Sequence, residues 1–200
     1  MAVYKASNSG VLTRREYNSF LAGNTAFDPA AFDSISTVTV GSGGASNITF
    51  SSIPSTYQHL QVRITAKGNR SIAIENAYLT FNGDSGSNYN SHAIYGDGSS
   101  VIAGTNTDPG MLIYTFAGNG GTTGSNVFGA GVVDILDYTN TNKNTTIRSL
   151  AGYENNSAGL LGFNSGLWRN TSSVTSLTLT PTGGTAWLQN SSFALYGIKE

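Results

Sequence analysis

Few residues of this chain have the types and spacing that catalysis requires. The sequence holds two histidines, His59 and His92, and no cysteine. A serine triad would need one of these histidines beside an activated serine, but there is no G-x-S-x-G turn, and residues 162–166 (GFNSG) read as an ordinary turn. We expect His59 to form hydrogen bonds at a strand edge and His92 to lie in a loop. Zinc would need several His or Cys ligands, so we expect no metal and no cofactor.

Paired carboxylates are the remaining route to catalysis, because glycoside cleavage uses two of them. Asp134 and Asp137 are predicted near one strand end, while the other acidic residues are scattered among loops. Residues 82–88 (NGDSGSN) place oxygen atoms at alternate positions, as calcium loops do, but the bidentate glutamate of such loops is missing. No spacing singles out a catalytic pair, so we expect the protein not to be an enzyme.

A sugar-binding site is a separate hypothesis. Tyr95 and Trp168 are predicted near loops, where their rings could stack on a sugar, and Asp97 could bind its hydroxyl groups. The same aromatic side chains could instead fill the core or a subunit interface, where their large buried area stabilises most. We favour the core or interface interpretation.

The composition limits the partners. The 200 residues fit one principal folded domain, and they carry a net charge of −1 with only 10% charged residues. A nucleic-acid-binding protein needs a basic surface to displace counterions, so we expect no nucleic-acid partner. No apolar leader and no run of membrane-spanning length is present, and we therefore expect no membrane partner.

Alternating hydrophobicity predicts strands from residue 33 to the end of the chain. Leu60, Val62 and Ile64 fall on one face of the segment 60–67, with polar residues between them. Turn-forming Gly, Asn and Ser clusters separate short segments of this kind, which is typical of a β-sandwich. We predict an all-β, antiparallel β-sandwich that is jelly-roll-like and spans 33–200. The predicted strands are 34–40, 46–51, 60–67, 77–82, 91–95, 111–117, 127–138, 145–153, 159–168, 174–180 and 191–198.

Two of these segments have further features. Residues 128–132 (FGAGV) contain two glycines, which weaken a plain strand, so we predict a bulge or a tightly packed crossing there. Residues 193–198 (FALYGI) are apolar on both faces, and we place them centrally in a sheet.

Residues 1–32 differ from the rest and are predicted to form an N-terminal anchoring arm. Thr13 and Glu16 have the spacing of a capping box, which predicts a short helix over about 14–22. Isolated helices below ~12–15 residues are marginal in water, so this one must pack on its own domain or on a partner. We favour docking on a partner, through residues that the sequence places on or beside the helix: Leu12, Arg14, Arg15, Tyr17, Phe20 and Leu21.

Three segments resemble structural proteins of tailed bacteriophages: residues 32–41 (FDSISTVTVG), 48–60 (ITFSSIPSTYQHL) and 193–199 (FALYGIK). The resemblance covers about residues 32–198. It implies a β-sandwich virion protein with an N-terminal anchor, usually a homotrimer, and it brings no catalytic residue.

We therefore expect a capsid decoration (cement) subunit, made in the bacterial host cytoplasm and incorporated into the virion, that binds the major capsid or tail protein. The alternative is a tail or head fibre adhesin that binds host surface glycans.

Overall fold

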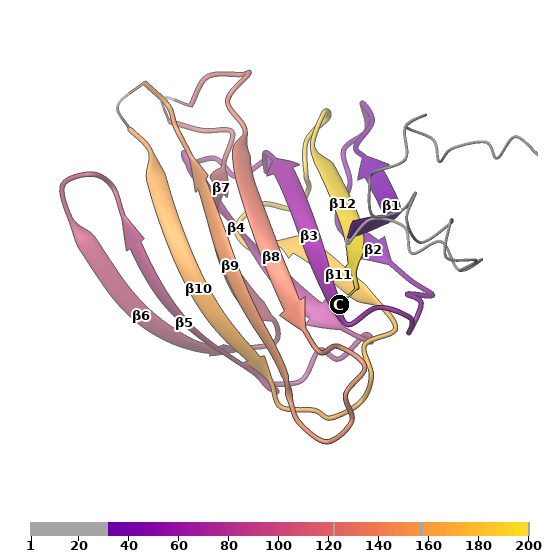
Figure 1. The fold of residues 1–200 in the computed structure, drawn as a ribbon. Coiled ribbons are helices and arrows are strands. Elements are labelled where there is room, and N and C mark those ends of the chain that lie inside the picture. Colours follow the sequence, from indigo (N-terminus) through magenta and orange to yellow (C-terminus); the bar gives the residue numbers. More distant parts are fainter. Residues whose placement is uncertain (1–31, 122, 157, 200) are drawn as a thin grey trace, which may run out of the picture.

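Two antiparallel sheets stack face to face in the computed structural model, which describes residues 32–121, 123–156 and 158–199 (Figure 1). The described residues are all-β and contain no helix, so the predicted antiparallel sandwich is confirmed. The strands are β1 (Phe32–Thr39), β2 (Ile48–Phe50), β3 (His59–Ala66), β4 (Ile74–Phe81), β5 (Tyr89–Gly96), β6 (Val101–Asp108), β7 (Met111–Ala117), β8 (Gly129–Leu136), β9 (Thr145–Tyr153), β10 (Leu160–Trp168), β11 (Leu177–Pro181) and β12 (Ser192–Ile198).

The sheets differ in size. The larger has eight strands in the order β1-β12-β3-β8-β9-β10-β5-β6, and the smaller has four in the order β2-β11-β4-β7. Only the β5–β6, β8–β9 and β9–β10 connections join neighbours within one sheet; every other connection crosses to the opposite sheet. This crossing of the chain explains why strands distant in sequence share one core.

The core lies between the sheets and follows the alternation read from the sequence. In β3, Leu60, Val62 and Ile64 are buried, while the residues between them face outward or are partly exposed. Both tryptophans, Trp168 and Trp187, are fully buried. The core interpretation of these aromatic side chains is therefore correct for the tryptophans.

Strand β7 is the edge strand of the smaller sheet and is buried along most of its length. Asn164 of the larger sheet binds two of its open backbone groups: Tyr114 N–H donates to Asn164 Oδ1 at 3.3 Å, and Asn164 Nδ2 donates to Leu112 O at 3.0 Å. Glycines of β8 make room for it, since a Cβ on Gly129 would lie 2.8 Å from Phe116 Cα. The pairing of β8 with β3 and β9 shows no register shift, so residues 128–132 include a tight crossing and not a bulge.

The strand predictions are confirmed with two corrections. Residues 162–166, predicted to be a turn, lie inside β10, because Gly162 and Gly166 face inward and β7 side chains pack against them. His92, predicted in a loop, lies in β5. β6 was not predicted, and β12 lies between β1 and β3 as its two apolar faces indicate. The predicted arm helix and its docking residues lie outside the described residues.

Candidate binding face

The outward side of the larger sheet carries a row of apolar side chains. Cross-strand pairing places Ile94 of β5 beside Phe163 of β10, and Phe163 beside Leu150 of β9. Val132 of β8 continues the row beside Leu150. Phe163 is 52% exposed and Ile94 is 48% exposed, which is unusual for large apolar residues in the middle of a sheet.

A second row lies one step along the strands. Leu161 of β10 is 52% exposed and pairs with Gly96 of β5 on one side and Gly152 of β9 on the other. A hollow lies on each side of Leu161, one lined by Gly96 and one by Gly152. The hollow beside Gly152 has a volume of about 780 Å³ and the one beside Gly96 about 610 Å³, and Leu161 lines both. We call these two rows together the open face. The first row contains Ile94, Phe163, Leu150 and Val132, and the second contains Gly96, Leu161 and Gly152.

Charged groups border the open face along β9. Arg148 precedes the apolar rows, and Glu154 follows them and lines both hollows. Arg148 Nε donates to Asp134 Oδ2 at 2.9 Å, and the Arg148 side chain is 71% exposed. Asp134 therefore has a structural partner on the neighbouring strand.

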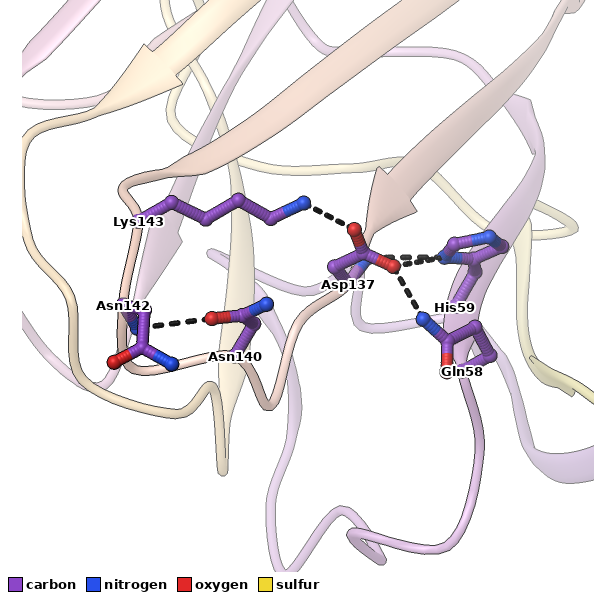
Figure 2. Close-up of polar contacts among 6 residues, drawn as sticks. All are labelled: Gln58, His59, Asp137, Asn140, Asn142 and Lys143. Carbon is purple, nitrogen blue, oxygen red and sulfur yellow. Dashed lines mark hydrogen bonds and ion pairs between the residues drawn. The ribbon is translucent and has the colours of Figure 1, made fainter.

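Asp137, the other acid predicted at this strand end, lies directly after β8 with a left-handed φ of 48°. Its carboxylate accepts hydrogen bonds from Lys143 Nζ and Gln58 Nε2 (Figure 2). Its backbone N–H donates to His59 Nδ1 at 2.9 Å, so this nitrogen acts as an acceptor and His59 anchors the strand end as predicted. The bonds from Lys143 and Gln58 hold the pKa of Asp137 below its usual range. The cluster closes the 137–143 turn onto β3.

Asp84, at the centre of the loop that resembles a calcium site, also uses its carboxylate for hydrogen bonds within the fold. Its carboxylate accepts from Trp168 Nε1 at 2.8 Å, from Gly86 N at 2.9 Å and from Asn88 Nδ2 at 3.0 Å. Within residues 32–121, 123–156 and 158–199, no three His, Asp or Glu side chains come together as a metal ion would need.

The structure separates the three candidate sugar contacts. Trp168 is 1% exposed and stacks beside Tyr89 in the core, so a sugar cannot reach its ring, and this assignment is wrong. Tyr95 and Asp97 lie close together at the other end of β5 and both line the hollow beside Gly96, but the Tyr95 side chain points to the inner side of the sheet. The Tyr95 ring stacks on Tyr114 at 5.0 Å, and Asp97 Oδ1 accepts from the backbone N–H of Ser99 and Ser100.

Two buried charged residues were missed from the sequence. Lys67 is 1% exposed, and its Nζ donates to Gly124 O at 2.7 Å and Ser125 O at 3.2 Å. Burial lowers the pKa of its ammonium group. Glu75 is fully buried, and its carboxylate accepts 2.8 Å hydrogen bonds from the backbone N–H groups of Gly183 and Gly184. Both residues fasten loops that are distant in the sequence.

The open face was also missed, although β10 carries a readable signal. Its inward residues Gly162, Asn164 and Gly166 are small or polar, while Leu161 and Phe163 point outward. This is the reverse of the usual arrangement for a strand with one buried face. This reversal leaves the large apolar side chains of β10 on the outward side of the sheet.

No family model, curated protein or solved structure matches this chain. In the part of the chain that the structure describes, no helix is long and apolar enough to cross a membrane.

Proposed function

We propose that this chain is a non-enzymatic structural protein of a phage virion, acting as a capsid decoration subunit. In this proposal the sandwich is a jelly-roll-like body, and residues 1–32 are an arm with one short helix that attaches it to the major capsid or tail protein. The phage resemblance of residues 32–41, 48–60 and 193–199 gives the setting. The open face is the single structural observation that supports a role in assembly.

The chemistry of the described side chains is in keeping with this role. A contiguous exposed apolar surface is typical of protein–protein interaction sites. The acids that could perform proton transfer are instead used to fasten the fold: Asp84 holds the indole of Trp168, and Asp137 holds Lys143 and Gln58. Uncharged Ser, Thr and Asn side chains, in which the chain is rich, are also less costly to desolvate in a subunit contact than ions are.

Imaging of intact particles tests the proposal. Antibody labelling or electron cryomicroscopy should locate the chain on the capsid surface of virions that carry its gene. Full-length Tyr17→Ser/Phe20→Ser should remain folded but show reduced occupancy on particles, whereas Ile72→Ser, at an exposed apolar residue of the sandwich, should retain full occupancy. Absence of the chain from purified virions would refute the proposal.

Placement of Asp97 beside Phe163 on one hollow favours a second candidate, a tail or head fibre adhesin for host glycans. Phe163 lines the same hollow and offers an exposed aromatic ring, which the buried Trp168 does not. Binding on a glycan array that disappears in Phe163→Ser and weakens in Asp97→Asn would favour this candidate over capsid decoration.

A further inference from the structure

We propose that two copies of this chain associate through their open faces, related by a two-fold axis in the interface. The axis crosses the strands midway between the Phe163 row and the Leu161 row. This pairing rests on the geometry of the sheet and does not depend on the virion assignment. A two-fold interface requires a surface that is complementary to itself, and two features of the open face, its relief and its charge, meet that requirement.

The first feature is the match between projections and hollows. The Phe163 row has projecting side chains on both sides of Phe163, namely Ile94 and Leu150. The next row has a hollow on each side of Leu161, lined by Gly96 on one side and by Gly152 on the other. The axis exchanges the two rows, so Ile94 of each copy enters the partner's hollow beside Gly96.

By the same operation, Leu150 enters the hollow beside Gly152, and Phe163 packs against Leu161. The continuous cross-strand pairing fixes these positions, because β5, β10 and β9 show no register shift across either row. Facing sheets that pack ~10 Å apart bring such side chains into van der Waals contact.

The second feature is charge. Arg148 lies in β9 and Glu154 directly follows it, each three residues from Ala151, which is midway between the two rows. The axis therefore places Arg148 of one copy opposite Glu154 of the other, twice per dimer. Arg148 uses its Nε for Asp134, while its side chain is 71% exposed, so it extends into the region that a partner would occupy. Any other register along the strand loses this pairing of opposite charges.

The size of the face sets the expected affinity. The strip from Arg148 to Glu154 contains seven residues, a length of ~20 Å, and the strands from β6 to β3 span ~24 Å. The projected area of roughly 500 Å² per copy lies below the ~800 Å² of a standard interface. We therefore expect a reversible dimer with a Kd on the order of micromolar.

Sedimentation velocity of the full chain tests the association. We expect a concentration-dependent monomer–dimer equilibrium over about 1–500 μM, weakened at high salt. Phe163→Ser should raise the dimer Kd at least about tenfold, since it removes an aromatic side chain from the centre of the contact. Ile72→Ser is the matched control, because Ile72 is 46% exposed but lies in the loop after β3, away from the open face. Circular dichroism would verify that both variants fold.

Cross-linking tests the register. The chain has no native cysteine, so Arg148→Cys/Glu154→Cys provides the only two thiols. Within one copy these positions are ~20 Å apart, beyond the roughly 10 Å reach of a short bismaleimide, so only a dimer with the proposed register is linked efficiently. Each single variant should give little linked dimer.

Three results would overturn the proposal. A full chain that stays monomeric at about 500 μM would show that two copies do not pair on this face. A dimer unaffected by Phe163→Ser, or one that is not linked in the double-cysteine variant, would place the contact elsewhere. A trimer, the state implied by the phage resemblance, would exclude a simple two-fold pairing.

Discussion

The indole Nε1–H of Trp168 donates a 2.8 Å hydrogen bond to Oδ2 of Asp84, across 84 residues of sequence. Trp168 ends β10 in the larger sheet, and Asp84 lies in the loop that carries the chain from β4 in the smaller sheet to β5 in the larger. The bond therefore ties the two sheets together at one end of the sandwich. Tyr89 belongs to the same cluster, since its hydroxyl donates to the backbone oxygen of Asp84 at 2.9 Å.

Replacing the Asp84 carboxylate should loosen this end of the sandwich. Asp84→Ala leaves the buried Trp168 indole without its acceptor, so we expect the free energy of unfolding to fall by about 1–3 kcal/mol. Asp84→Asn keeps a neutral acceptor and should lose less. Urea unfolding followed by tryptophan fluorescence measures both variants. An Asp84→Ala protein as stable as the wild type would show that the indole bond adds nothing net.

The same contact predicts an acid-labile component of stability. Hydrogen bonds from the Trp168 indole and the Gly86 amide hold the pKa of Asp84 below its usual 3.8. A depressed folded-state pKa adds stability that is fully present well above pH 3.8 and is lost as the pH falls through the folded value. Urea midpoints measured from pH 6 down to pH 2 should fall less steeply for Asp84→Ala than for the wild type. Parallel curves would contradict the prediction.

Tyr89 predicts the opposite pH response. Burial raises the pKa of Tyr89 to about 12 from 10.0, so the folded state holds this proton more tightly than the unfolded state. Its contribution is complete below pH 10 and is lost as the pH rises toward 12. Tyr89→Phe should cost about 1–2 kcal/mol at pH 7, because Phe81 N–H loses its 3.0 Å bond to the hydroxyl.

Alkaline denaturation separates these two effects of Tyr89. The stability difference between the wild type and Tyr89→Phe should shrink between pH 10 and pH 12, and chemical denaturation at several pH values would show it. A difference that stays constant would mean that Tyr89 does not titrate in the folded state as its burial requires.

Two glycines test the packing of β7 against β8. Gly129→Ala should lower stability by about 1–3 kcal/mol, because its Cβ would lie 2.8 Å from Phe116 Cα, a backbone atom that cannot rotate away. Gly104→Ala in β6 is the matched control, since no atom lies within 4 Å of its Cβ position. Thermal unfolding of both variants measures the contrast. Equal melting temperatures would mean that β7 shifts without cost.

Lys67 predicts a stability that increases with pH. Burial lowers the pKa of its ammonium below 10.5, so the unfolded chain binds the proton more tightly than the folded chain. Stability therefore rises as the pH increases from the lowered folded value toward 10.5. Lys67→Met lacks this rise, and the difference between the two proteins, measured by urea unfolding from pH 7 to pH 10, should change with pH. A pH-independent difference would contradict the prediction.

Hydrophobic periodicity in the sequence was sufficient to predict most strands, but it did not predict the exposed apolar side chains on the surface of the larger sheet. The alternation in β3 and β9 and the mostly apolar segment of β7 predicted strands, and for Met111–Ala117 and Thr145–Tyr153 the bounds are the observed ones. β6 escaped prediction because it is exposed on both faces along most of its length, so burial leaves no apolar alternation in its sequence.

The open face could not be deduced from composition because it depends on which side of each strand faces inward. In β10, the inward positions are occupied by glycines that admit β7, and this choice sends Leu161 and Phe163 outward. The partners of Lys67 and Glu75 are backbone groups of distant loops, and no side-chain motif marks them. These features arise from the way in which the chain crosses between the two sheets, not from the local propensities of the residues.

The antiparallel pairing of β1 with β12 has a mechanical consequence. Phe32 lies opposite Ile198, so the first residue of β1 and the last residue of β12 leave the sandwich side by side. A pull applied between those two points would open the hydrogen bonds of the pair one after another, as a zipper opens, since the bonds lie perpendicular to the strands. A pull between Phe32 and Ser192, at opposite ends of the same strand pair, would instead run along the strands and load the bonds of the pair together. The lifetime of the folded sandwich under force would therefore depend strongly on the direction in which the force is applied.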